Sequence, residues 1–172
     1  PEYIRLERRL SQKAQEKGYL ELNDLKDIAD WGGNQHGIRE RLRRNNSEAG
    51  IRLATSRAIK KLSNHSEALE AMLQIRHWGL SYATKTLRCV APESYPALDQ
   101  KLRKGISKDL LPAIHDGHVD SIIRGYLAFV KLCQLIRQQT AEAGPRPGRV
   151  WFLADIEMAL FQFTWEGGTL IS

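Results

Sequence analysis

Hydrophobic residues recur at intervals of three and four along most of the chain, a period that predicts α-helices. Segments 22–31, 51–62 and 153–163 each carry such a stripe. The longest, from Val119 to Ala141, has one broad apolar face, which suits a buried helix. No segment alternates between apolar and polar residues as clearly, so we expect an all-α fold.

Glycine and proline mark the breaks between these stripes. Gly32-Gly33 ends one helical segment and Ala91-Pro92 ends another. The strongest break is Ala143-Gly-Pro-Arg-Pro-Gly148, which predicts a loop over residues 143–148. This loop is short for a linker between domains, so residues 1–172 are expected to form a single compact helical domain.

Composition narrows the class of protein. The 172 residues include 26 Lys and Arg against 20 Asp and Glu, a formal net charge of +6. Two cysteines, Cys89 and Cys133, are too few for a four-cysteine iron–sulfur cluster, an all-cysteine zinc site or a disulfide scaffold. The five histidines have no spacing that indicates a metal site, and no organic cofactor is expected.

The sequence carries no sign of a membrane partner. No apolar run reaches the roughly 20 residues needed to cross a bilayer. The first residues, Pro1-Glu-Tyr-Ile-Arg5, lack the apolar core of a signal peptide. We therefore expect a protein inside the cell, in the cytoplasm or nucleoid, and the oligomeric state stays open.

The most informative segment is Leu73-Gln-Ile-Arg-His-Trp-Gly-Leu-Ser-Tyr-Ala-Thr-Lys-Thr-Leu87. It predicts a helix ending near Arg76, a tight turn through Gly79, and a second helix beginning near Ser81. Gly79 is expected to occupy a turn position open to positive φ. The first amides of the second helix have no partner within that helix and lie at the positive end of its dipole, so they suit a phosphate.

This segment resembles the helix-hairpin-helix element of the endonuclease III-type DNA glycosylase superfamily. The family pattern, Leu-Pro-Gly-apolar-Gly-x-x-Thr-Ala, corresponds here to Ile75-Arg-His-Trp-Gly-Leu-Ser-Tyr-Ala83. In the family a catalytic Asp follows that Ala at a distance similar to that of Asp99, which stands 16 residues after Ala83. The approach Pro92-Glu-Ser-Tyr-Pro-Ala-Leu-Asp99 is similar as well. The resemblance puts a helix-hairpin-helix at about residues 66–90 and an Asp-bearing loop at 91–99.

The resemblance implies a DNA-glycosylase-like fold, double-stranded DNA as the partner, and Asp99 as the catalytic carboxylate. Such enzymes hold a phosphate with amides of the hairpin, often with a monovalent cation, while the target nucleotide is flipped out of the duplex. Carried over, these amides belong to Trp78, Gly79 and Ser81. With the neighbouring side chains, the expected DNA-binding residues are His77, Trp78, Gly79, Leu80, Ser81, Lys85, Lys101, Arg103 and Lys104.

Two of the departures from the family bear on the expected chemistry and on phosphate binding. Ser81 stands where lyase members carry a nucleophilic Lys, and a serine cannot form a Schiff base. The resemblance therefore implies a monofunctional glycosylase, with Lys85, one turn further on the same face, as the candidate for a substitute nucleophile. His77 replaces the first glycine of the hairpin, which makes the turn less permissive and weakens the expectation of a bound cation.

Other interpretations of the same residues stay open. A non-catalytic protein that binds DNA structure would keep the hairpin without the chemistry, and a helical protein-interaction module would carry the resemblance by chance. Asp99 also fits the N-cap of a short helix that begins at Gln100. The basic run Arg39-Glu-Arg-Leu-Arg-Arg44 fits a solvated helix face as well as a DNA contact.

Aromatic and acidic residues supply the remaining candidates. Trp78 is the tryptophan whose position in the turn favours exposure, whereas aromatic residues at helical spacing are more often buried. Asp155 and Glu157 suggest a second acid. Asp155 lies off the apolar stripe, so we expect it to be exposed or to sit at the start of a helix.

Overall fold

Helices make up nearly all of the regular structure. The structure, a computed structural model, describes residues 2–140 and 142–171. The domain predicted from the sequence covers residues 1–172, so positions 1, 141 and 172 of that prediction lie outside the described residues. The α-helices are α1 (Glu2–Lys17), α2 (Leu22–Trp31), α3 (Ile38–Asn45), α4 (Glu48–Lys60), α5 (His65–Leu73), α6 (Leu80–Val90), α7 (Gln100–Gly105), α8 (Val119–Gln139) and α9 (Leu153–Trp165). Two short 3₁₀ turns cover Gln35–Gly37 and Pro147–Arg149, and one isolated β-bridge joins Ile106 to Leu170. The prediction of an all-α, compact single domain is confirmed.

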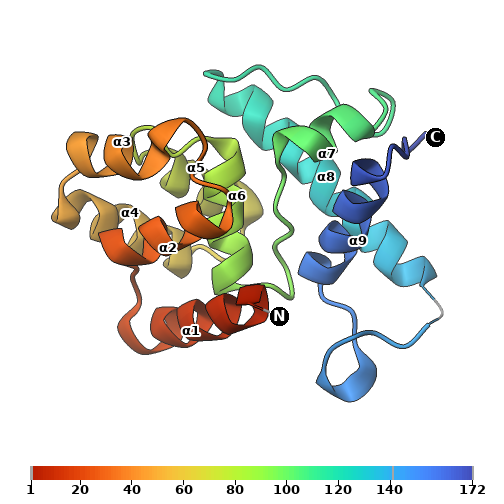
Figure 1. Ribbon diagram of the computed structural model, residues 1–172, viewed down its shortest axis with the longest axis horizontal. Helices are drawn as coiled ribbons and strands as arrows, with labels where there is room; N and C mark the ends of the chain where they lie inside the picture. The colour runs from red at the N-terminus through yellow and green to blue at the C-terminus, as the bar shows by residue number, and fades with distance from the viewer. Residues whose placement is uncertain (1, 141, 172) are drawn as a thin grey trace.

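The helices form two groups with an extended segment between them (Figure 1). Helices α2 to α6 make up one group, with α1 packed against α6, and helices α7 to α9 make up the other. Residues 91–99, here called the strap, carry the chain from the first group to the second. Residues 95–98 of the strap are buried, although loops normally run over the surface. This part of the strap therefore belongs to the interior.

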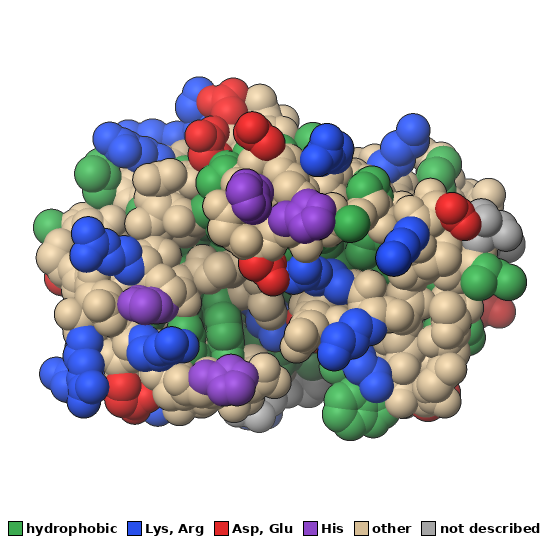
Figure 2. Space-filling view, turned by 90° about the horizontal axis from the view of Figure 1, so that it is seen from above, with side chains coloured by type: hydrophobic (Ala, Val, Ile, Leu, Met, Phe, Trp, Pro, Cys, Tyr) green, Lys and Arg blue, Asp and Glu red, His purple; other side chains and the backbone are tan. Residues whose placement is uncertain are grey.

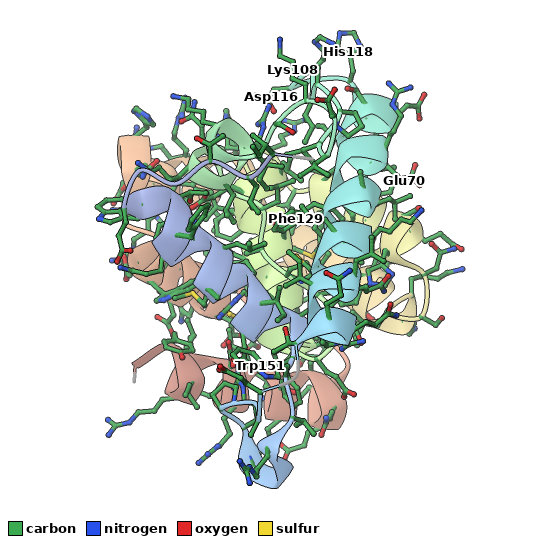
Figure 3. The ribbon with its side chains drawn as sticks, turned by 90° about the vertical axis from the view of Figure 1, so that its right-hand side faces the viewer. Glu70, Lys108, Asp116, His118, Phe129 and Trp151 are labelled. Atoms are coloured by element: carbon green, nitrogen blue, oxygen red, sulfur yellow. The ribbon has the colours of Figure 1, made fainter. Side chains whose placement is uncertain are left out.

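An apolar core continues through both groups of helices, because each helix turns its apolar stripe inward. Tyr126 and Phe129 of α8 have no exposed surface, and Phe129 lies near the middle of the molecule (Figure 3). Lys108 and His118 lie in the connection between α7 and α8 at one end, and Trp151 lies toward the other end.

The starts of several helices are capped by polar side chains. Ser47 accepts a hydrogen bond from the Gly50 amide at the start of α4, at 3.0 Å. Asn64 accepts hydrogen bonds from the amides of Ser66 and Glu67 at the start of α5. Such caps replace hydrogen bonds that the first helical amides cannot make within the helix. In the described ranges, no helix has both the length and the apolar content to cross a membrane.

A network of buried charges joins α1, α6, α9 and the loop before α9. Arg88 of α6 has no exposed surface and lies 2.7 Å from both Glu7 of α1 and Glu157 of α9. Glu7 also accepts a hydrogen bond from Arg146 at 2.9 Å, and Arg146 pairs with both carboxylate oxygens of Asp155. The Arg88–Glu7 contact is close but is not aligned as a hydrogen bond, whereas Arg88 Nε donates to Glu157. The network thus connects elements far apart in the sequence.

Replacing Arg88 by Met is expected to lower the free energy of unfolding by about 3 kcal/mol or more, because it leaves two buried carboxylates without their cation. Denaturant unfolding measures this loss. Arg39→Met is the control, since Arg39 forms a partly exposed pair with Asp30 and such pairs contribute about 1 kcal/mol at most. Equal losses in the two variants would contradict a central role for Arg88.

Candidate functional site

The turn between α5 and α6, residues 74–79, is held in shape by a residue from elsewhere in the chain. Asn46, between α3 and α4, accepts a hydrogen bond from the Arg76 amide at 2.9 Å and donates to the Arg76 carbonyl at 3.0 Å. Within the turn, the Trp78 amide donates to the Ile75 carbonyl at 3.1 Å. Because Asn46 belongs to another part of the helical group, tertiary packing helps to set the shape of this turn.

The residue with positive φ in this turn is His77. Its φ is 63°, in the left-handed region that favours glycine. Gly79 has a φ of −69° and a ψ of −176°, and a Cβ atom added there would meet nothing within 4 Å. The expectation of a positive φ at Gly79 is therefore wrong. The chain reverses two residues earlier, where the family pattern has its first glycine and this chain has an exposed histidine.

Trp78 is a core residue. Its side chain is 1% exposed, and its indole nitrogen donates a hydrogen bond to Thr86 at 3.0 Å. Its ring packs against that of Tyr82, with the centroids 4.8 Å apart. The expectation of an exposed Trp78 is wrong, and its amide, already bonded within the turn, is not available to a phosphate. The exposed tryptophan is Trp165, at 64%.

The amides at the start of α6 belong to Gly79, Leu80, Ser81 and Tyr82. They precede the first hydrogen bond of the helix, which runs from the Ala83 amide to the Gly79 carbonyl. Gly79 is exposed, Ser81 is half-buried, and the side chain of Leu80 is buried. Gly79 stands at the cap position, and the Ser81 hydroxyl contacts Lys85 Nζ at 3.3 Å.

Asp99 is half-buried at the start of α7. Its Oδ1 accepts a hydrogen bond from the Leu102 amide at 3.0 Å, so it is the N-cap of this helix. Among the described residues, the side-chain hydrogen bond of Asp99 involves Oδ1 and leaves Oδ2 without a partner. One carboxylate oxygen is therefore fixed by the fold and the other is open to a ligand or water.

The strap that leads to Asp99 is tied to helices on both sides. The Leu98 amide donates a hydrogen bond to the buried hydroxyl of Thr84 in α6, at 3.0 Å. The hydroxyl of Tyr126 in α8 donates to the Pro96 carbonyl at 2.9 Å. These contacts fix Asp99 beside α6.

The amine of Lys85, on α6, lies close enough to Asp99 for the two charges to interact. Burial lowers the pKa of Lys85, and the negative charges of Asp99 and Glu157 oppose that shift. Its Nζ lies 5.4 Å from the centroid of the Tyr82 ring and 5.9 Å from that of Trp31. Lys85 is thus a partly desolvated cation beside aromatic rings and the expected catalytic carboxylate.

Glu157 of α9 is a second carboxyl group near Asp99. Burial raises the pKa of Glu157 to about 7; the cation of Arg88 opposes this shift, and the charge of Asp99 adds to it. Asp155, the other member of the acidic pair, is buried against Arg146, so its expected exposure is wrong. Its expected place at a helix start is confirmed, since it accepts the Phe152 amide. Two carboxyl groups in unlike surroundings are an arrangement suited to acid–base chemistry.

The basic residues after Asp99 differ in their surroundings. Lys101 and Lys104 are exposed, whereas Arg103 pairs with Asp116 at 3.0 Å. Figure 2 shows Lys and Arg side chains spread over one face of the molecule, with His and a few acidic side chains among them. Lys101 and Lys104 are therefore better placed than Arg103 to meet a phosphate.

Sequence reasoning missed Asn46 and Thr84, and it interpreted Trp31 as an aromatic residue of the core. A threonine on the buried face of an amphipathic helix is a signal that could have identified Thr84. Asn46 and Trp31 carry no such local signal, because their contacts are with distant segments.

Two cavities open elsewhere on the molecule. One of about 410 Å³ has Ser11, Leu62 and Phe152 among its lining residues, and one of about 240 Å³ is lined in part by Arg103 and Lys104. Neither includes Asp99. Within residues 2–140 and 142–171, no group of three or more His, Cys, Asp or Glu side chains is arranged to hold a metal ion.

No family model, curated protein or solved structure matches this chain. Segment 73–99 and the side chains around Asp99 are therefore the features of this chain that point to a function.

His77→Gly is expected to raise the free energy of unfolding by about 0.5–1 kcal/mol, because glycine adopts the positive φ without the steric cost of a Cβ atom. Denaturant unfolding of the variant and the wild type measures the difference. Gln74→Gly is the control: Gln74 has a φ of −70°, so glycine there should destabilise the protein. Destabilisation by His77→Gly would show that the histidine side chain makes a compensating contact.

The raised pKa of Glu157 predicts a pH dependence of stability. Between its ordinary pKa of 4.5 and its folded value of about 7, the folded protein binds a proton that the unfolded chain has released. This stabilising contribution is complete below about pH 4.5 and is lost as the pH rises through 7.

Unfolding midpoints of the wild type and of Glu157→Gln, measured from pH 4.5 to pH 8, test this assignment. Because glutamine does not titrate, the stability of the wild type relative to the variant should fall across this range. A constant difference would show that Glu157 stays ionised in the folded protein.

Proposed function

We propose that this protein is a monofunctional DNA glycosylase, which hydrolyses the N-glycosidic bond of a damaged or mismatched base in double-stranded DNA. Asp99 is the catalytic carboxylate. The observation that carries the proposal is the combination of the family-like turn before α6 with an Asp that is fixed beside α6 and keeps one carboxylate oxygen open. A DNA-glycosylase-like fold with a helix-hairpin-helix formed by α5 and α6 belongs to the same proposal.

Hydrolysis breaks the bond between the sugar carbon C1′ and the base nitrogen, and the electron pair leaves with the base. Positive charge develops on the sugar, and a carboxylate beside C1′ stabilises it. Water adds to C1′ and gives up a proton to Asp99, while the departing base takes up a proton. The open Oδ2 of Asp99 suits both tasks, because Oδ1 is already engaged in capping α7.

The DNA backbone is held at the start of α6. The amides of Gly79, Leu80 and Ser81 lie at the positive end of the helix dipole and bind a phosphate. The exposed Lys101 and Lys104 bind neighbouring phosphates. Such contacts position the duplex without reading its sequence and make binding dependent on salt.

A non-catalytic protein that binds DNA structure is the second candidate. The observation in its favour is that Asp99 already has a structural role as the N-cap of α7, which requires no chemistry. This candidate predicts salt-sensitive binding to duplexes without release of any base.

Base release from labelled duplexes, each carrying one lesion or mismatch, tests the proposed function. The wild type is expected to produce strand breaks only after alkali treatment, since Ser81 cannot act as the lyase nucleophile. Asp99→Asn should reduce the rate of base release by about 100-fold or more. Asparagine is as good an N-cap as aspartate, so α7 should stay intact in this variant.

Asp109→Asn makes the same chemical change at an exposed position and should leave base release unchanged. Breaks without alkali would contradict the monofunctional assignment and would identify Lys85 as the nucleophile to test. Duplex binding without base release would favour the second candidate. Absence of duplex binding at low salt would contradict both and favour a helical protein-interaction module.

A further inference from the structure

The surroundings of Asp99 contain cations that lie against aromatic rings. Lys85 and Arg88, one turn apart on α6, both approach the Trp31 ring, at 5.9 Å and 5.1 Å from its centroid. Lys85 also lies 5.4 Å from the centroid of the Tyr82 ring. The electron-rich faces of these rings are thus engaged by the protein's own cations.

Lys85 has hydrogen-bonding capacity beyond its contacts within the protein. An ammonium group carries three N–H donors. In the described part of the chain, its hydrogen bond is to the Ser81 hydroxyl, at 3.3 Å. Because the side chain is partly buried, an acceptor brought by a ligand would satisfy donors that are costly to leave unpaired.

Close packing limits the movement of Lys85. A Cβ atom added at Gly32 would lie 3.0 Å from Tyr82 Cε1 and 3.5 Å from Lys85 Cδ, so the end of α2 closely covers both side chains. The Tyr82 hydroxyl accepts a hydrogen bond from the Gln35 amide at 3.3 Å. The amine is therefore pre-positioned, as a residue that selects a ligand needs to be.

We propose that Lys85 determines which base this site accepts: it donates a hydrogen bond to a carbonyl oxygen of an uncharged base and excludes positively charged alkylated purines. Uncharged bases with such a carbonyl are the class formed when normal bases are deaminated or oxidised. This inference rests on the proposed function, because it concerns the base released beside Asp99.

Charge is the first reason for this selectivity. A cationic base would approach the like charge of Lys85 in a site where repulsion is less screened than in water. It would also meet aromatic rings that already have cationic partners. Asp99 attracts a cation, whereas Glu7 and Glu157 are already paired with Arg88, so the ammonium of Lys85 is the positive charge that opposes a cationic base.

Hydrogen bonding is the second reason. A carbonyl oxygen accepts a bond from a charged donor, and such bonds are stronger than those between neutral groups. 3-Methyladenine has no carbonyl oxygen to accept this bond, and 7-methylguanine keeps one but brings a positive charge beside the donor. Both effects therefore favour the uncharged class.

Single-turnover base release from two sets of duplexes tests the inference. The first set carries uracil, hypoxanthine or 8-oxoguanine, and the second carries 7-methylguanine or 3-methyladenine as cationic nucleotides. The wild type is expected to release at least one base of the first set and to release the second set more slowly. Lys85→Met, which retains the apolar stem, should slow release of the uncharged base by about tenfold or more, whereas Lys85→Arg should keep the preference between the sets.

Lys131→Met, which removes an exposed lysine from α8, is the matched control and should leave both rates unchanged. Faster release of a cationic base by the wild type would overturn the inference without requiring any variant to fold. A rate for Lys85→Met within about twofold of the wild type would also overturn it. Either result leaves the proposed function standing. Release of no base from either set by the wild type would instead contradict the proposed function, and this inference with it.

Discussion

The arrangement of helices around the candidate site depends on the buried guanidinium of Arg88. It is the cation shared by Glu7 of α1 and Glu157 of α9, and Arg146 completes the set of charges through Glu7. A buried arginine is tolerated only where carboxylates stay close, so these segments are constrained to meet. Salt screens such a pair much less than a surface pair.

The ion pairs of Arg88 also constrain the positions of the residues proposed for catalysis. Lys85 lies one turn before Arg88 on α6, and Glu157 is the hydrogen-bonding partner of Arg88. Asp99 is the last residue of the strap, which is held against α6 by the hydrogen bond from the Leu98 amide to Thr84. The carboxylates and the amine therefore meet where the two groups of helices join, on rigid elements rather than on a mobile loop.

Within the family-like segment, local pattern and observed geometry diverge at two positions. Glycine at position 79 predicted the point of reversal, but Asn46 holds the turn so that His77 takes the left-handed conformation. Trp78 was expected to be exposed because it stands in a turn, yet Thr86 and Tyr82 supply a buried environment for its indole. Both differences arise from contacts with residues outside the turn, which the sequence of the turn does not reveal.

The sequence by itself determined the helical class, the long helix that begins at Val119 and the family-like segment, and it offered the N-cap role of Asp99 as one of two alternatives, because each of these signals lies in residues close together along the chain. A helical stripe repeats every three or four residues, and a cap acts within one turn. Only the tertiary structure decided the partners of Arg88, the burial of Asp155 and the surroundings of Lys85. Arg88 and Glu157 are 69 positions apart, and the strength of their interaction depends on how much water the packed helices exclude. No local pattern encodes that quantity, so the fold class could be predicted while the electrostatics of the site could not.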